Sequence, residues 1–289
     1  MKDGTGIGNA PQTPGPIALR MPNRQFRYAS ATNQPLRANG QHAFAQDHAM
    51  CLYRRDAVYT MIPKNGCTTM RLSLAIDNGC LSRPDQIHWI HANNDAFRPG
   101  LRELQVAAYT FVVLRCPFTR LVSAFVDKIV SIKREAWNLH DALGRSRNIE
   151  EMSFAEFVGL LQRPGILAFD IHWRPQVDFL VYEAYDDYFA LERFAAATAR
   201  LTAHLGLPVH DARSLSRHGI SHLQLQTDGN WAQAPAHEIR QMKREGRAPA
   251  YSAMYTPELV EQVRSIYGQD LALYARHLDS TDLLFPESA

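Results

Sequence analysis

Two short segments carry residue types that suit the binding of phosphate, and the first of them spans residues 60–70 (TMIPKNGCTTM). A predicted buried strand leads there into Lys64 and Gly66, and then into Thr68 and Thr69 at the start of a predicted helix. The N-terminus of a helix offers free backbone N–H groups and the positive end of the helix dipole. Glycine lets the backbone approach a ligand closely, lysine adds a mobile positive charge, and the threonine hydroxyls add donors. This combination favours a polyanion as the ligand.

The order of residues in this segment differs from that of the ATP-binding P-loop. The pattern GxxxxGK[ST] is absent, and Lys64 precedes Gly66 instead of following it. The segment therefore does not predict magnesium-dependent ATP hydrolysis. Taken alone, it is explained equally well by an ordinary strand–helix turn with a solvated lysine.

The second segment, residues 110–128, reads TFVVLRCPFTRLVSAFVDK. Arg115 directly follows a predicted buried strand, and ligands of open α/β folds bind at the carboxyl ends of such strands. Ser123 lies two residues from both Leu121 and Phe125, so at about 100° per residue it turns away from the apolar stripe of its helix. Arg115 and Ser123 could thus hold a second phosphate, although a structural ion pair for Arg115 and a surface position for Ser123 are the alternative. Two anion motifs in consecutive strand–helix units predict a ligand with phosphate groups at two ends.

Strands that alternate with helices must position these segments. The predicted strands cover residues 57–62, 109–114 and 185–191. The predicted helices cover residues 68–76 with Thr68 as the N-cap, 117 to about 137, a short stretch after a capping box at Ser153, 192–205, and a last helix from 256. Residues 207–250 show no clear period and are expected to form long loops. This alternation predicts an α/β fold with a mostly parallel central sheet flanked by helices.

Residues 46–289 are expected to form a single domain, and residues 1–45 a flexible or wrapping arm rich in Pro, Gly, Asn and Gln. The chain has 31 Lys and Arg against 29 Asp and Glu, a net charge of +2, which predicts no general nucleic-acid surface. No apolar run approaches the roughly 18 residues of a membrane span, and the N-terminus lacks the apolar core of a signal peptide. A cytoplasmic protein is therefore expected. None of the four cysteines forms a CxxC pair, so no metal site is predicted.

Both segments resemble motifs of the carbohydrate sulfotransferases that use 3′-phosphoadenylyl sulfate (PAPS), a group with Golgi-type and heparan 2-O-like enzymes and bacterial relatives. IPKNGCTTMRLSL looks like their 5′-phosphosulfate loop, and LRCPFTRLVSAFVDK looks like their 3′-phosphate motif. Cys116 stands where that motif commonly has Asp, whereas Arg115, Pro117, Arg120 and Ser123 are all present. Downstream, DIHWRPQVDFLVYEAYDDYFALERF resembles the family's His-Trp-x-Pro-Gln segment, and ELVEQVRSIYGQDLALY resembles its C-terminal helix. The resemblance covers residues from about 55 to about 275.

This resemblance implies a P-loop-like α/β fold and PAPS as the co-substrate, without a metal. Carried over by position, it assigns the 5′-phosphosulfate to Lys64, Asn65, Gly66, Cys67, Thr68 and Thr69. It assigns the 3′-phosphate, which distinguishes PAPS from other adenylates, to Arg115 and Ser123.

Transfer to a sugar hydroxyl needs a general base. Some carbohydrate sulfotransferases carry a catalytic histidine between the two motifs, where this chain reads QIHWIHANND. The resemblance therefore implies His91 as the first candidate and His88 as the second. Asp95 and Glu103 remain alternative carboxylate bases.

The HWRP segment is expected to contact the acceptor through His172, Trp173 and Arg174, and His172 is also the third candidate for the base. We expect in-line transfer of the sulfuryl group to a hydroxyl of a carbohydrate or glycoconjugate, with Lys64 neutralising the charge on the leaving oxygen. The alternatives are a P-loop-type nucleotide kinase, a non-catalytic nucleotide-binding relative, and transfer to a protein tyrosine, a lipid or a small metabolite. The sequence does not determine the acceptor or the oligomeric state.

Overall fold

The structure is a computed structural model that describes residues 24–93, 95–215, 220 and 223–286. Its central sheet contains four strands in the order β1 (Ala49–Leu52), β2 (Ala57–Thr60), β3 (Tyr109–Leu114) and β4 (Asp187–Ala190). Strands β2, β3 and β4 run parallel, and β1 pairs antiparallel with β2 at one edge. The predicted α/β fold with a mostly parallel central sheet is therefore confirmed.

The described part of the chain also contains the following α-helices: α1 (Gly40–Asp47), α2 (Cys67–Asp77), α3 (Trp89–Ala92), α4 (Leu101–Val106), α5 (Pro117–Ala124), α6 (Arg134–Ala142), α7 (Phe154–Leu161), α8 (Phe194–Leu205), α9 (Ala236–Arg244), α10 (Pro257–Ile266) and α11 (Gly268–His277). A π-helical segment, Phe125–Val130, continues α5. A second, two-stranded parallel sheet pairs β5 (Gln224–Gln226) with β6 (Arg247–Pro249). None of the described helices has the length and apolar character that crossing a membrane requires.

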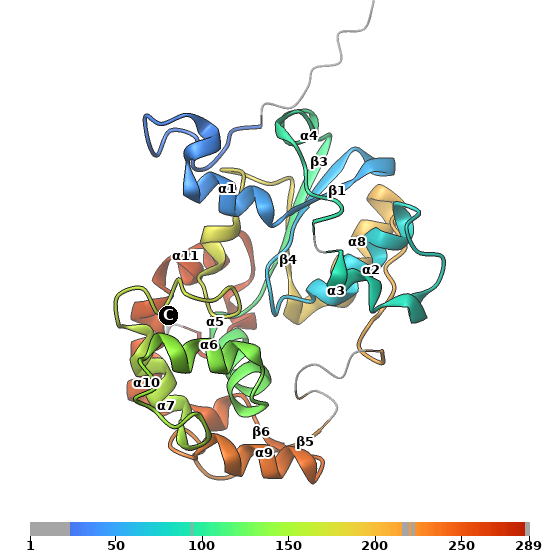
Figure 1. Cartoon of the computed structure of the whole chain (residues 1–289). Coiled ribbons are helices and arrows are strands. Elements are labelled where there is room, and N and C mark those ends of the chain that lie inside the picture. The colour runs from blue at the N-terminus through green and yellow to red at the C-terminus, as the bar shows by residue number, and fades with distance from the viewer. Residues whose placement is uncertain (1–23, 94, 216–219, 221–222, 287–289) are drawn as a thin grey trace, which may run out of the picture.

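Side chains of β3 alternate between two hydrophobic layers, since successive residues of a strand point to opposite faces of the sheet. Tyr109, Phe111 and Val113 pack in one cluster with residues of α2 and α8. Val112 and Leu114 pack in a larger cluster with residues of α5, α7 and α10. Helices thus cover both faces of the sheet (Figure 1), which explains why β3 is an almost uninterrupted apolar run.

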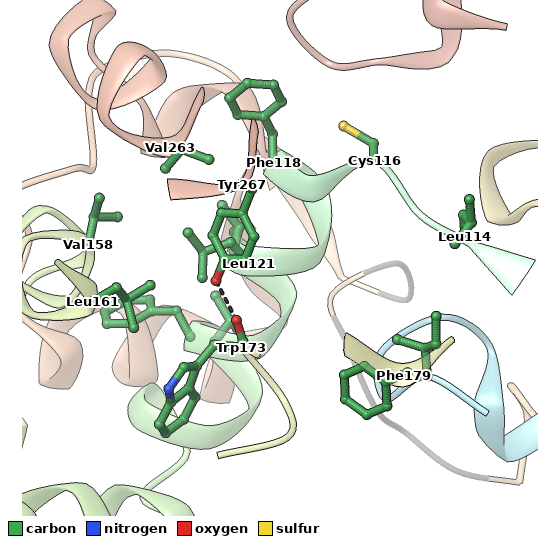
Figure 2. Packing of buried hydrophobic residues seen from close by; sticks show 14 of the residues in the cluster. Leu114, Cys116, Phe118, Leu121, Val158, Leu161, Trp173, Phe179, Val263 and Tyr267 are labelled. Carbon is green, nitrogen blue, oxygen red and sulfur yellow. Dashed lines mark hydrogen bonds between the residues drawn. The ribbon is translucent and has the colours of Figure 1, made fainter. Parts of the chain in front are cut away.

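The larger layer connects the second phosphate-type segment to the C-terminal helices. Phe118 and Leu121 of α5 belong to the same buried cluster as Val263 and Tyr267 at the α10 end. The hydroxyl of Tyr267 donates to the backbone carbonyl of Trp173 within this cluster (Figure 2). The chain around Trp173 is therefore attached to the core that also supports α5.

The strand–turn–helix unit around the first phosphate-type segment is present, but its helix begins one residue earlier than predicted. Helix α2 starts at Cys67, and Gly66 is the N-cap residue with a φ of +74°. The prediction of Thr68 as the N-cap is wrong, because a glycine in the left-handed region begins this helix without any side-chain cap. The strand predicted at residues 109–114 coincides with β3.

The helix predicted from residue 117 to about 137 is interrupted. After the π-helical segment the chain turns at Ile132, where φ is +46°, and α6 then begins at Arg134. The end of the π-helical segment is held by a distant part of the chain, because the ammonium of Lys243 donates to the hydroxyl of Ser131, the residue before Ile132, at 2.7 Å. Local periodicity could not reveal this contact.

The described part of residues 207–250 is more ordered than expected, since it contains α9 and both strands of the β5–β6 sheet. Strands β5 and β6 are three residues long and pair only with each other across about twenty residues, so the local pattern carries no signal for them. The last predicted helix is in fact two helices, because α10 ends at Ile266 and α11 begins at Gly268.

The described part of the N-terminal arm packs along the domain. The guanidinium of Arg24 donates to the carbonyl of Ala107 and pairs with Asp186 at 2.7 Å. Helix α1 runs across the boundary predicted at residue 45. Residues 1–23 of the predicted arm lie outside the described residues.

Candidate functional site

The two phosphate-type segments line one cavity of about 910 Å³ at the carboxyl ends of β2 and β3. Because β2 and β3 are parallel neighbours, the turns that follow them emerge at the same edge of the sheet. The cavity is lined by these residues of the predicted donor site: Lys64, Gly66, Cys67, Thr68, Thr69, Arg115 and Ser123. The fold therefore brings two segments that are distant in sequence to a common surface.

The loop between β2 and α2 presents the first turn of α2 to the cavity. Lys64 and Gly66 both have a left-handed backbone, with φ of +71° and +74°. A side chain at position 66 would meet the Cδ1 atom of Leu191 at 3.0 Å, so the packing of this loop requires glycine. The hydroxyl of Thr69 accepts from the backbone N–H of Ala212 at 3.1 Å, which attaches another part of the cavity wall. The N–H groups of the α2 terminus are thus held at the cavity.

Asn65 differs from its neighbours in this loop, because its side chain is fully buried behind the cavity wall. Its Nδ2 donates to the carbonyl of Val113 at 2.8 Å and to Oε1 of Gln176 at 2.6 Å. The predicted contact between this side chain and the donor is therefore corrected to a structural one. Asn65 attaches the loop to the end of β3.

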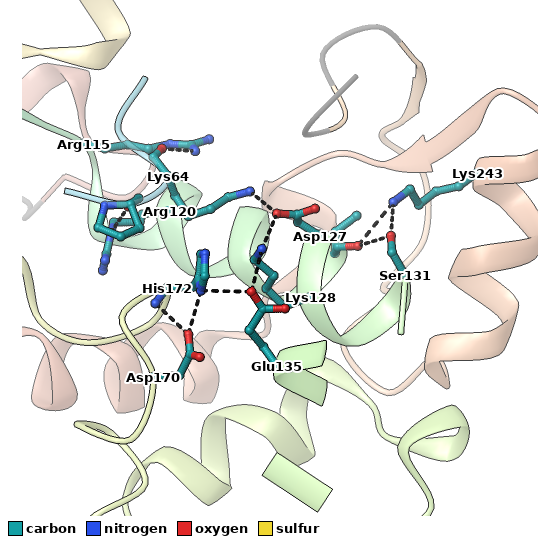
Figure 3. Close-up of polar contacts among 12 residues, drawn as sticks. Lys64, Arg115, Arg120, Asp127, Lys128, Ser131, Glu135, Asp170, His172 and Lys243 are labelled. Carbon is teal, nitrogen blue, oxygen red and sulfur yellow. Dashed lines mark hydrogen bonds and ion pairs between the residues drawn. The ribbon is translucent and has the colours of Figure 1, made fainter. Parts of the chain in front are cut away.

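The ammonium of Lys64 forms an ion pair with Asp127 at 2.8 Å, and the two side chains are 9% and 11% exposed (Figure 3). Burial lowers the pKa of Lys64, and the carboxylate of Asp127 counteracts that shift. Asp127 lines the cavity from the π-helical segment, four residues after Ser123. It is a site residue that the sequence reasoning missed, although its spacing from Ser123 was an available signal.

The guanidinium of Arg115 is held on the cavity wall by three hydrogen bonds. It donates to the carbonyl of Lys64 at 2.9 Å, to the hydroxyl of Tyr251 at 3.1 Å and to the hydroxyl of Thr119 at 3.1 Å. Arginine has five N–H donors, so two remain after the bonds to the described residues. Ser123 and Tyr251 line the same cavity, and no sequence signal pointed to Tyr251. An anion here would meet an arginine whose orientation is already determined.

Gln176 connects the two phosphate-type segments from behind. Its Oε1 accepts from the backbone N–H of Arg115 at 3.0 Å and from Asn65, and its Nε2 donates to the carbonyl of Arg115 at 2.9 Å. The backbone N–H of Gln176 donates to the buried carboxylate of Asp270 at 2.8 Å. This buried network, which joins β3, the first loop and α11, sets the relative position of the two turns.

His172 lies on the cavity wall with its Nδ1 atom 2.7 Å from Oδ1 of Asp170. Its backbone N–H donates to the same oxygen at 2.8 Å. Burial raises the pKa of Asp170, but the hydrogen bonds and charge of His172 outweigh burial, so the pKa lies below its ordinary value. Glu135 is 3.8 Å from Nδ1, and ion pairs of Lys128 with Glu135 and Asp127 extend this chain of charges towards Lys64 (Figure 3).

The next two residues of the HWRP segment point elsewhere. Trp173 is fully buried, and its Nε1 donates to the carbonyl of Ile166 at 2.9 Å. Arg174 pairs with Asp178 and lies over the ring of Phe44. Neither side chain lines the cavity, so the expected acceptor contacts of Trp173 and Arg174 are corrected to structural ones.

The candidate bases between the two motifs separate into two groups. His91 on α3 and Asp95 line the cavity, whereas His88 is exposed and is not part of the cavity wall. Glu103 is occupied at the start of α4, where its carboxylate accepts from the backbone N–H of Gly100 at 2.9 Å. Of the four candidate bases between the motifs, only His91 and Asp95 therefore line the cavity.

Basic side chains outnumber acidic ones around the cavity. The basic ones are Lys64, Arg71, Arg115, Lys128, Lys133, Arg134 and Arg213, and the acidic ones are Asp47, Asp95, Asp127 and Glu135. Such a surplus raises the local concentration of anions. Over the ranges that the structure describes, no group of three His, Cys, Asp or Glu side chains could hold a metal ion.

Comparisons with known proteins give one match. A model of the sulfotransferase family matches residues 47–275 of the chain, a range that includes every residue of the cavity wall up to Tyr251. The comparison with curated proteins gave no match, and neither did the comparison with solved structures.

Proposed function

Since the chain belongs to the sulfotransferase family, we propose that it transfers the sulfuryl group of PAPS to a hydroxyl group of a carbohydrate or glycoconjugate. The family relationship agrees with the resemblance of the two segments to sulfotransferase motifs. The donor and the acceptor class are the parts of this proposal that require their own argument and test.

The observation that carries the proposal is the presence of two anion-binding elements against one cavity. Lys64 and the N-terminus of α2 form the first element, and Arg115 with Ser123 forms the second. PAPS carries a phosphosulfate on its 5′ side and a phosphate on its 3′ side. A ligand with anionic groups at both ends matches two such elements better than a ligand with a single anionic end.

In this mechanism the protein positions the two reactants and stabilises charge. Arg115 and Ser123 hold the 3′-phosphate, which orients the phosphosulfate at the first loop. The ammonium of Lys64 and the N–H groups at the α2 terminus neutralise negative charge that develops on the bridging oxygen as the S–O bond breaks. Since these groups supply the neutralisation, the proposal requires no metal ion.

Trp137 supports a carbohydrate as the acceptor. Its side chain is 54% exposed on α6, and Arg134, three residues earlier on the same helix face, lines the cavity. An exposed tryptophan one helical turn from a residue of the cavity wall offers a large apolar face on which a sugar ring can stack.

Calorimetric titration with adenosine 3′,5′-bisphosphate, the desulfated product, tests the donor assignment. We expect it to bind more tightly than 5′-AMP or ATP–Mg²⁺, because only the bisphosphate engages both anion-binding elements. A preference for ATP–Mg²⁺ would overturn the assignment in favour of a kinase, and the absence of binding would favour a non-catalytic relative.

Incubation with ³⁵S-labelled PAPS tests the acceptor class. The acceptors to compare are unsulfated heparosan, unsulfated chondroitin, a tyrosine-containing peptide and dodecanol, each with and without EDTA. Label in a polysaccharide, at the same rate with EDTA, supports the proposal. Label only in the peptide or the alcohol would overturn the carbohydrate assignment, and loss of transfer with EDTA would overturn the metal-free mechanism.

A further inference from the structure

We infer that His172, oriented by Asp170, is the general base that takes the proton from the acceptor hydroxyl. This inference rests on the proposed sulfuryl transfer and names a base outside the interval between the two motifs. In the sequence His172 was only a third candidate, expected mainly to contact the acceptor.

The contact with Asp170 determines which ring nitrogen of His172 can act as a base. Nδ1 of His172 lies 2.7 Å from Oδ1 of Asp170, a carboxyl whose lowered pKa keeps it ionised at neutral pH. An ionised carboxylate only accepts hydrogen bonds, so Nδ1 must carry the proton. In the neutral imidazole the other nitrogen, Nε2, then has a free lone pair. This is the tautomer that a general base requires.

The imidazole of His172 lies where the lone pair of Nε2 can reach an acceptor hydroxyl. His172 and Lys64 line the same cavity, and the His172 side chain is 17% exposed. Figure 3 shows Nδ1 directed at Asp170 and the opposite edge of the ring directed away from that carboxylate, on the side where Lys64 lies. A hydroxyl that approaches the sulfur atom at Lys64 therefore approaches the free edge of the imidazole.

The backbone around His172 is held by buried groups. Arg120, which is 2% exposed, donates to the carbonyls of Ile171 and Arg174 on either side of it. The ring of Trp173 between them is fully buried. A base supported in this way keeps its orientation, which general-base catalysis requires. His91 lies instead on the four-residue helix α3 and is exposed.

The chemical step is balanced without a further reactant. The acceptor oxygen forms a bond to sulfur while the bond from sulfur to the bridging phosphate oxygen breaks, and the hydroxyl proton passes to Nε2 of His172. The products are the sulfate ester and adenosine 3′,5′-bisphosphate. The imidazolium then releases its proton to solvent.

The kinetic test compares His172→Gln, Asp170→Asn and His91→Gln with the wild-type chain, using PAPS and a mixture of the four acceptors named above. We expect His172→Gln to lower kcat by about 10²- to 10⁴-fold and to leave the Kd of the bisphosphate unchanged. A general base acts only in its unprotonated form, so the wild-type rate should fall towards acid pH, and His172→Gln should lose this acid limb. Asp170 acts as a positioning residue. The Asp170→Asn variant should therefore have a lower maximal rate, but its rate should still fall towards acid pH.

His237→Gln is the matched control, because His237 lies on α9 beside Glu150 and does not line the cavity. We expect it to retain the wild-type rate. Wild-type kcat in His172→Gln would overturn the inference, and so would loss of the acid limb in His91→Gln instead.

A second measurement needs neither donor nor acceptor. In ¹⁵N spectra of the full chain, the His172 signals, identified by their loss in His172→Gln, should show the neutral imidazole with Nδ1 protonated and Nε2 unprotonated. An Nε2–H tautomer would overturn the inference, even for a protein that transfers sulfate. A wild-type chain that has the Nδ1–H tautomer but neither binds the bisphosphate nor turns over PAPS would overturn the proposed function, and the assignment of a base with it.

Discussion

The ammonium of Lys64 lies 2.8 Å from the carboxylate of Asp127, and both side chains line the cavity that the two phosphate-type segments share. This pair places a buried positive charge on the wall of the same cavity as the N-terminus of α2, whose dipole also favours anions. An ammonium group has three donors, so Lys64 can contact a phosphosulfate while it remains bonded to Asp127.

Replacement of Lys64 by alanine should lower kcat for sulfuryl transfer by about 10²- to 10³-fold, because the leaving oxygen loses its positive partner. The measurement is the initial rate with saturating PAPS and the best acceptor. Circular dichroism and thermal unfolding should accompany it, since the variant leaves Asp127 buried without this partner. A folded Lys64→Ala protein with a normal rate would contradict the site assignment.

The Asp127→Asn variant should shift the pH dependence of donor-site binding. Burial lowers the pKa of Lys64, Asp127 raises it, and Arg115 and Lys128 lower it further. Without the carboxylate, the pKa of Lys64 falls, so the ammonium is lost at a lower pH than in the wild-type chain. Bisphosphate affinity should therefore decline earlier as pH rises, which titrations between about pH 6 and about pH 10 would measure.

Lys64→Arg is the control for that experiment, because a guanidinium stays protonated over the whole range. Its affinity should show no alkaline decline. Identical alkaline limbs in the wild-type chain and Asp127→Asn would show that Asp127 does not control the charge of Lys64.

Changes at Arg115 should affect binding of the 3′-phosphate of the donor and leave binding of its 5′ side nearly unchanged. Arg115→Ala should weaken binding of adenosine 3′,5′-bisphosphate by about 10- to 100-fold, the range for a charge-assisted hydrogen bond of ~1.5–3 kcal/mol. Binding of 5′-AMP should change much less, because it has no 3′-phosphate. Arg115→Lys should recover only part of the affinity, since lysine lacks the planar fork. Equal losses for both nucleotides in calorimetry would contradict the assignment.

Gln176→Leu should destabilise the fold and the site together. It leaves the N–H and carbonyl of Arg115 without their partner in a buried region, and it removes one of the two acceptors of the Asn65 amide. At about 1–3 kcal/mol for each unsatisfied group, the free energy of unfolding should fall by about 3 kcal/mol or more. Urea unfolding would measure this, with Gln162→Leu, at an exposed position, as the control. Wild-type stability in Gln176→Leu would show that the network contributes little.

Gly66→Ala should reduce both stability and bisphosphate affinity. The residue has a φ of +74°, and an added Cβ would lie 3.0 Å from Leu191. The expected cost is about 1–2 kcal/mol, since an L-residue is strained in the left-handed region. Gly159→Ala, inside α7 with open space around it, should instead stabilise the protein by about 0.5–1 kcal/mol. A stabilising effect at both positions, read as Tm, would contradict the requirement for glycine at position 66.

Much of the architecture could be read from the sequence because its signals are local. The buried strand β3 is an apolar run that matches its predicted bounds, since a strand covered on both faces needs apolar residues in succession. The common location of Lys64 and Arg115 follows from parallel strands, whose following turns emerge at one edge of a sheet. These features require only residue types, their order and the handedness of the connections.

Tertiary structure alone decided which partner each polar group has. Nothing in the local pattern shows that Asn65 bonds to Gln176, or that Lys243 bonds to Ser131 at the end of the π-helical segment. His172 and Asp170 are neighbours in sequence, but the contacts of Arg120 decide where their segment lies. A buried polar group bonds to whichever partner the packed chain brings near, and that partner can come from any segment of the sequence. The periodicity of apolar residues predicts which side of a helix or strand is buried, but it does not predict which residues that side contacts.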